Sequence, residues 1–185
     1  MQKEKESGTP EQDTQAQKPK AKSGKVWKAL LRLVIKIAVI AGLLAAVWTY
    51  VGEFFVLHNN SMYPNVKDGA LVITYKQVVY NREDVVLYEV FGIRQLARII
   101  GLPGDVIEIT GDGTYTINGN IPYEAITEKT YPVDSNVEYP YKLKPNEYFL
   151  MNDMRDVSND SRLFGGITNR LLHGKVVFMI QYRGI

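Results

Sequence analysis

The chain has 185 residues, no cysteine, and 22 lysines and arginines against 20 aspartates and glutamates, for a formal net charge of +2. That length suits one modest domain with an appendage, and so small a charge gives no support to a nucleic-acid-binding surface. The absence of cysteine excludes disulfides, thiolate metal sites and a cysteine nucleophile. No His, Asp and Glu cluster has the spacing of metal ligands, so we predict neither a metal nor a cofactor.

The composition changes abruptly near residue 26. Residues 1–25 consist mainly of Lys, Glu, Gln, Ser, Thr and Pro, which predicts a disordered tail. Residues 26–55 predict a membrane anchor helix, because Leu33–Phe55 supplies about the 20 apolar residues that cross a bilayer. A cleaved signal peptide has a shorter core and small residues at its exit. Trp48 and Tyr50 here instead resemble an interfacial aromatic belt.

Positive charge gathers before and at the start of the predicted anchor, and Ile37–Val51 carries none. Basic residues on one side of a membrane helix mark the cytoplasmic side. We therefore expect a single-pass protein of the plasma membrane with a cytoplasmic N-terminus and residues 56–185 outside. The basic residues are Lys18, Lys20, Lys22, Lys25, Lys28 and Arg32.

Residues 56–185 show the pattern of an all-β domain, with runs of β-branched and aromatic residues between turn signals. A helix is predicted only for Thr168–Leu172, with Thr168 as N-cap and Gly174 as the stop signal. Residues 123–145 hold three prolines and predict a loop-rich excursion. The predicted strands are residues 70–75, 84–90, 94–102, 106–109, 115–117, 147–151 and 176–180.

Three short motifs follow the anchor in order. Residues 61–64 read Ser-Met-Tyr-Pro, and Pro64 stiffens the backbone around the serine hydroxyl. Residues 97–105 read Ala-Arg-Ile-Ile-Gly-Leu-Pro-Gly-Asp, a strand that runs into a turn. Residues 152–162 read Asn-Asp-Met-Arg-Asp-Val-Ser-Asn-Asp-Ser-Arg. Alone, each motif is typical of a turn or a charged loop, so their order and spacing carry the information.

Together these motifs resemble those of the type I signal peptidases of Gram-positive bacteria, over roughly residues 30–182. The resemblance implies a signal peptidase I-like β domain after one transmembrane helix, with an apolar surface that rests on membrane lipid. It also implies a groove that takes the signal peptide of a preprotein as an extended strand, with small residues at two subsites.

The resemblance also assigns roles to individual residues. Ser61 matches the nucleophile, whose own backbone N–H helps to bind the oxyanion. Ala97 stands where the family has the lysine that acts as general base. Ser158 matches the serine that bonds that lysine, and Asp160 with Arg162 matches an ion pair that braces the site. A serine hydroxyl needs a base, and alanine offers no proton acceptor.

Three interpretations stay open. In the first, the protein has lost hydrolysis and kept peptide binding, as an accessory of pilus assembly with pilin and sortase as candidate partners. In the second, it is a working signal peptidase in which Ala97 was introduced as a trap. In the third, another base such as His58 activates the serine, while His173 is structural. Asn152 and Met154 replace the family's Gly and Asn, which favours the first, because a single engineered change would leave that loop intact.

Overall fold

The computed structural model describes residues 23–76, 79–123 and 128–181, and the chain divides into two compact units between Leu43 and Leu44. The first holds most of α1 (Ser23–Tyr50), and Val26–Ala46 within it is long and apolar enough to cross a membrane. The described side chains of this segment are exposed, as expected of a single-pass membrane protein.

The helix ends before the predicted limit of residue 55. Val51–Val56 forms strand β1, so the anchor helix predicted to Phe55 was wrong over its last five residues. The valines and phenylalanines of this stretch favour a strand, and pairing with β2 (Leu71–Tyr75) stabilises it. Of the predicted tail, residues 1–22 lie outside the described residues, while 23–25 are helical.

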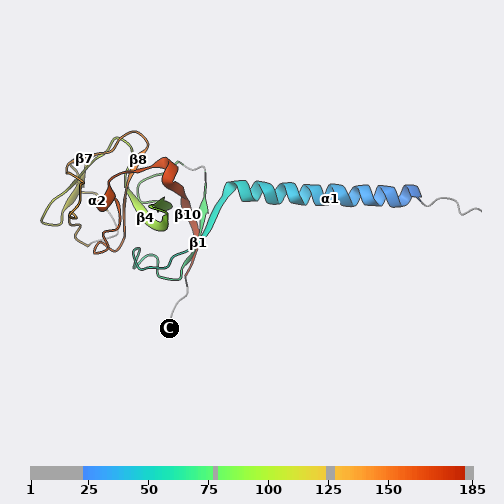
Figure 1. Cartoon of the computed structure of the whole chain (residues 1–185), viewed down its shortest axis with the longest axis horizontal. Coiled ribbons are helices and arrows are strands. Elements are labelled where there is room, and N and C mark those ends of the chain that lie inside the picture. The colour runs from blue at the N-terminus through green and yellow to red at the C-terminus, as the bar shows by residue number, and fades with distance from the viewer. Residues whose placement is uncertain (1–22, 77–78, 124–127, 182–185) are drawn as a thin grey trace, which may run out of the picture. The chain divides into compact units, whose positions relative to one another are not determined.

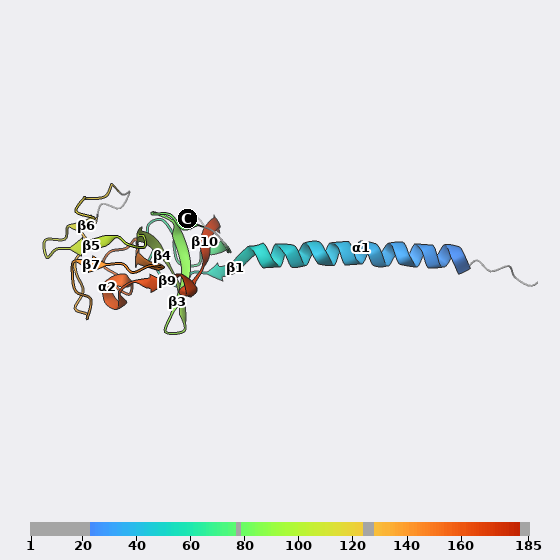
Figure 2. The same cartoon turned by 90° about the horizontal axis from the view of Figure 1, so that it is seen from above.

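The second unit is mainly β structure, which confirms the prediction of a β domain after one apolar helix (Figures 1 and 2). All its described strand pairs are antiparallel, in a seven-stranded and a three-stranded sheet. The large sheet has the order β1, β2, β10 (Leu172–Ile180), β3 (Val85–Val90), β4 (Ile93–Gly101), β8 (Glu147–Met151) and β9 (Ile167–Thr168). The small sheet has the order β6 (Tyr115–Ile117), β5 (Val106–Ile109) and β7 (Tyr141–Lys142).

The predicted helix over Thr168–Leu172 was largely wrong. Only Asn169–Leu171 is helical, as the single 3-10 turn η1, and the Thr168 side chain makes no capping bond. Gly174 does not stop a helix but lies inside β10. The prediction also missed α2 (Ser161–Phe164), which is too short to show an apolar period and depends on its cap, Asp160.

The buried side chains form three clusters that position the motifs. One joins the two sheets and includes Ile100, Ile107 and Phe149. A second holds Met62 with residues of β2, β3 and β4, and the third holds Ala97 among residues of β3, β8 and β9. Because neighbouring residues of β4 point to opposite faces, the strand contributes to both of these clusters.

Gly101 offers a test of the packing between the sheets. A Cβ at this position would lie 2.6 Å from Leu143 Cδ1 and 3.0 Å from Phe149 Cβ. Gly101→Ala should therefore destabilise the protein by about 1–3 kcal/mol, through overpacking. Gly111→Ala is the control, since a Cβ there meets nothing within 4 Å. Denaturant unfolding of the full chain in detergent measures both, and equal stability of the two variants would contradict the packing.

Candidate functional site

The carboxylate of Asp153 joins the three motifs. Its Oδ2 accepts a hydrogen bond from Asn65 Nδ2 at 2.8 Å. Arg98 binds the same carboxylate with two nitrogens, Nε at 2.8 Å and Nη2 at 2.6 Å. The Met154 N–H also donates to the carbonyl of Ser61 at 3.0 Å. The serine loop, the strand of Ala97 and the 152–162 segment therefore form one site around a fully buried carboxylate.

Ser61 lies buried in the loop after β1, only 4% exposed. Within the described residues its Oγ has no hydrogen-bond partner. Its backbone N–H donates to Asn59 Oδ1 at 3.0 Å, so the amide expected to bind an oxyanion is occupied here. A buried hydroxyl without a partner costs about 1–3 kcal/mol of stability, and such groups concentrate at functional sites.

Ala97 is fully buried in apolar surroundings. It pairs with Val86 across β3 and shares its cluster with Tyr88, Ile99 and Leu150. These apolar neighbours would lower the pKa of a lysine amine, as a general base requires. The methyl group of Ala97 supplies no such amine.

The segment that carries Ser158 lies against the same face of β4. Asn159 Nδ2 donates to Gln95 Oε1 at 3.3 Å, and Gln95 is two residues before Ala97 on the strand. The Tyr88 hydroxyl donates to the carbonyl of Asn159 at 3.5 Å. Burial raises the pKa of Tyr88, and the charge of Asp160 adds to it, so this tyrosine stays protonated. Ser158 itself is half-buried.

Asp160 and Arg162 form a buried ion pair, with Nη2 and Oδ2 2.8 Å apart. Arg162 also donates to the carbonyls of Arg155 and Val157, each at 2.8 Å. Asp160 Oδ2 accepts from the backbone N–H of Asn152 at 3.0 Å. The pair therefore holds the loop in shape. Asn152, which stands where the resemblance implies a glycine, is buried in this loop. Its Nδ2 donates a hydrogen bond to the carbonyl of Val157, so the loop is packed around the larger side chain.

The turn after β4 is held by a second carboxylate. Asp105 accepts hydrogen bonds from the Leu102 N–H at 2.6 Å and Asn118 Nδ2 at 2.8 Å. Arg82 Nη1 lies 2.7 Å from its Oδ2. Gly104 has a φ of 91°, which explains a glycine at this position of the turn. Burial opposes ionisation of Asp105, but Arg82 and the other donors outweigh it and lower its pKa.

The two histidines are in different settings. His58 is exposed in the segment after β1, and in the described chain no hydrogen bond or ion pair joins it to Ser61. His173 lies in an ionic cluster, with Nδ1 2.9 Å from Glu53 and Nε2 3.4 Å from Glu89. These contacts agree with a structural role for His173, and a base role for His58 stays a prediction.

In the described part of the chain, two strand edges of the large sheet lack a partner strand near the site. There β1 ends the sheet and pairs with β2, while β4 pairs with β8 from Arg98 onward. Within the described residues, the outer edge of Ile93–Ala97 therefore has no strand beside it. Glu53 of β1 and Arg94 of β4 nevertheless form an ion pair at 2.7 Å, although three strands separate them in the sheet. The sheet therefore curls enough for these two long side chains to meet.

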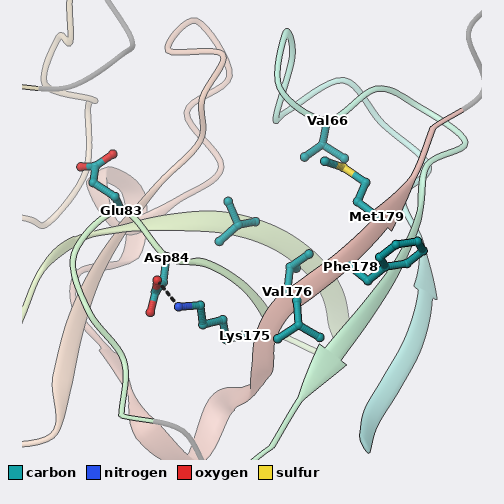
Figure 3. Close-up of a pocket in the computed structure, with 9 residues that line it drawn as sticks. Val66, Glu83, Asp84, Lys175, Val176, Phe178 and Met179 are labelled. Atoms are coloured by element: carbon teal, nitrogen blue, oxygen red, sulfur yellow. Dashed lines mark ion pairs between the residues drawn. The ribbon is translucent and has the colours of Figure 1, made fainter.

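A pocket of about 470 Å³ lies elsewhere, where β3 diverges from β10 (Figure 3). Val66, Val176 and Met179 supply apolar walls, and Lys175 and Asp84 form an ion pair of 2.6 Å at one end. Neither Ser61 nor Ala97 lines this pocket. Among the described residues, no group of three or more His, Asp or Glu could hold a metal ion.

Sequence reasoning missed the polar contacts that build the site. Asn65 and Gln95 gave no local signal, because their partners lie 88 and 64 residues away in the chain. The structure brings together the loop of Ser61, the strand of Ala97 and the segment of Ser158. The chemical roles of these residues stay predictions.

Comparisons with known proteins agree with the motifs. The model of the family described as signal peptidase, peptidase S26, matches residues 30–181. Signal peptidase I S of Bacillus subtilis is 34% identical over 140 residues, covering 69% of this chain and 74% of that protein. Signal peptidase IB of Staphylococcus aureus is 32% identical over 171 residues, covering 82% and 89%. A solved signal peptidase I from Enterococcus faecalis is 25% identical, covers 53% of this chain and 97% of that chain, and has a TM-score of 0.45.

Asp153→Asn tests the central carboxylate. It removes the negative charge that faces the buried end of Arg98, so we expect a loss of about 3 kcal/mol in unfolding free energy. Amide exchange of residues 60–66 should rise as well, because Asn65 loses a charged acceptor. Asp156→Asn, exposed in the same segment, is the matched control. Denaturant unfolding and hydrogen exchange of the full chain measure both, and similar behaviour of the two variants would refute the role of Asp153.

Asp105→Asn tests the turn through its pH dependence. Because the folded-state pKa of Asp105 is lowered, its ionised form stabilises the protein above the ordinary value of 3.8, and this contribution is lost as pH falls through the folded-state pKa. The variant should lose about 1–2 kcal/mol at pH 7. Its deficit relative to the parent protein should shrink below about pH 3.8. Unfolding measured between pH 7 and pH 2 checks this, and a deficit independent of pH would rule it out.

Proposed function

Since the chain belongs to the signal peptidase S26 family, we propose that it binds signal-peptide regions of preproteins at the outer face of the membrane, with hydrolysis lost or strongly reduced. The family processes signal peptides. We propose that this chain binds the same class of substrate without cleaving it.

The observation that carries the loss of hydrolysis is the environment of Ala97. Ala97 is fully buried within an apolar cluster, and the Ser61 hydroxyl has no hydrogen-bond partner among the described residues. Removal of one member of a hydrolase dyad or triad lowers the rate by about 10⁴ to 10⁶. Without a base the serine hydroxyl keeps its proton, and attack on a peptide carbonyl becomes very slow.

Peptide binding needs no base. The unpaired edges of β1 and β4 offer backbone donors and acceptors to an extended chain on both sides, the arrangement used in strand addition. Leu57, Met62 and Leu96 form the apolar cluster beside these edges. A signal peptide laid between the edges would lead toward Ser61, which follows β1 in the chain.

Membrane lipid is the second proposed partner. On the outer face of β1, β2 and β10, register pairing aligns two rows of apolar side chains. Phe54 and Phe178 are 64% and 56% exposed, a degree that marks an interaction surface in a soluble domain. Phe54 also follows the end of α1 by only four residues, which tethers this face close to the bilayer. The rows are Phe54, Ile73 and Phe178, and Val56, Leu71 and Ile180.

The proposed orientation puts the N-terminus in the cytoplasm. Lys25, Lys28 and Arg32 come at the start of α1, and basic residues are retained on the cytoplasmic side. The β domain then lies outside the cell, where preproteins emerge. In this setting we propose an accessory role in pilus assembly, with pilin and sortase as partners. It rests on the resemblance to family members that lack dyad residues.

One observation favours a second candidate, an active endopeptidase. Ser61, which matches the family's nucleophile, is retained and lies buried in the loop after β1. In that case Ala97 is an introduced trap or another base acts. The chromosomal codon at position 97 tests the trap directly.

Restoring the base separates the two candidates. Ala97→Lys should cleave a preprotein substrate, and the parent chain with Ala97 should be at least about 10⁴-fold slower. Ser61→Ala in the Ala97→Lys background should abolish that cleavage. Ala97→Met controls for packing, because methionine has nearly the length of lysine without its charge. Gel assays of preprotein processing measure the rates, and equal cleavage by the parent chain and the Ala97→Lys variant would refute the loss of hydrolysis.

Binding is measured on the same proteins. The full chain in lipid nanodiscs should bind a fluorescein-labelled peptide that has an apolar run followed by Ala-Gln-Ala, detected by fluorescence anisotropy. Replacement of both Ala residues by Phe should weaken binding, because the family's two subsites take small side chains. A chain that neither cleaves nor binds such peptides would overturn the proposal.

A further inference from the structure

Four ionisable side chains from β1, β3, β4 and β10 meet in one cluster. Glu53 Oε2 lies 2.7 Å from Arg94 Nη1, and Glu53 Oε1 lies 2.9 Å from His173 Nδ1. Glu89 Oε2 lies 3.0 Å from Arg94 Nε and 3.4 Å from His173 Nε2. Three of these strands, β10, β3 and β4, are neighbours in the sheet, so the cluster ties β1 to strands from which β2 separates it.

Glu53 is ionised in this cluster. Partial burial opposes ionisation, but the hydrogen bond and charge of His173, with the charges of Arg94 and Lys76, outweigh it and lower the pKa of Glu53. Arg94 is always charged at neutral pH. The 2.7 Å contact between them is therefore a full ion pair.

We propose that Glu53 and Arg94 form an ionic latch that holds the open edges of β1 and β4 together, and that an extended peptide opens it to bind. This inference rests on the proposed peptide-binding function and adds a control on access to the site. A strand inserted between the two edges would bring its backbone and one side chain into the space that the Glu53–Arg94 contact now spans.

The cluster allows the Glu53–Arg94 contact to break without leaving either charge unpaired. When the Glu53–Arg94 contact breaks, Glu53 keeps His173 and Arg94 keeps Glu89. Glu53 therefore retains a partner on β10, and Arg94 retains one on β3. The side chains of Arg94 and Glu53 are 47% and 23% exposed, so water and salt reach the pair and its contribution is modest.

The position of the latch also sets where it acts on a peptide. Arg94 is three residues before Ala97 on β4, a distance of about 10 Å along a strand. A peptide whose backbone reaches Ser61 at one end must therefore pass the latch a few residues away. The latch lies on the path of the peptide and leaves the nucleophile untouched.

Charge-neutral variants test the latch. Arg94→Gln and Glu53→Gln should each bind the labelled Ala-Gln-Ala peptide about two- to fivefold more tightly than the parent protein, because the closed state loses its ion pair. The double variant should bind no more tightly than either single variant, since one contact is removed in all three. Raising NaCl from about 0.05 M to about 0.5 M should tighten binding to the parent protein and leave Arg94→Gln unchanged.

Glu89→Gln is the matched control. It removes a carboxylate from the same cluster but leaves the Glu53–Arg94 pair, so it should not increase affinity. A second measurement needs no peptide: hydrogen exchange of the unliganded full chain. Arg94→Gln should speed exchange of the amides in residues 53–56 and 93–97, while those of β5 and β6 stay as they are.

The outcomes distinguish failure of the latch from failure of the proposed function. If the parent protein binds the peptide and the Gln variants bind equally or more weakly, the latch is refuted and the binding function stands. If no protein binds but Arg94→Gln speeds exchange at the two edges, the latch stands and the binding function falls. If neither binding nor faster exchange is seen, both are wrong.

Discussion

The buried carboxylate of Asp153 is the constraint on which the site depends. A carboxylate taken fully out of water must be paired and hydrogen-bonded, and here Arg98 and Asn65 do both. Those partners come from the strand of Ala97 and the loop of Ser61, while Asp153 belongs to the third motif. The need to pair this one buried charge therefore holds the three motifs together. Asp160 and Arg162 repeat the device within the last motif, where a second buried pair fixes the loop.

This scaffold explains how the proposed site keeps its shape with alanine at position 97. The described side-chain contacts of Asp153 run through Arg98 and Asn65 and do not involve residue 97. What changes is chemical: an apolar cluster suited to a neutral amine holds a methyl group, and the serine hydroxyl has no described partner. Binding surfaces and catalytic groups are physically separable, which is why the proposed function keeps the peptide and drops the reaction.

Seven of the ten described strands overlap the predicted ranges because burial imposes a local pattern on them, whereas β1, β7 and β9 were not predicted. Val85–Val90 and Val106–Ile109 are branched and apolar, and each lies within a residue of its predicted bounds. Elements without such a pattern were not predictable. The helix end at Tyr50 depends on pairing of β1 with β2, and α2 depends on a cap that Asp160 provides while it also binds Arg162. In the first case a tertiary contact decides a local conformation, while in the second a local cap does so in a helix too short to show an apolar period.

By itself, the sequence determined that the chain carries an apolar anchor, the motifs of its family and no proton acceptor at position 97, because each of these is a property of residue type and order. The tertiary structure alone decided which polar groups meet. Arg98 finds Asp153 55 residues away, and Arg94 finds Glu53 41 residues away. Both contacts depend on strand register and on the curl that brings β1 toward β4, and no local pattern of residues encodes a distance across a sheet.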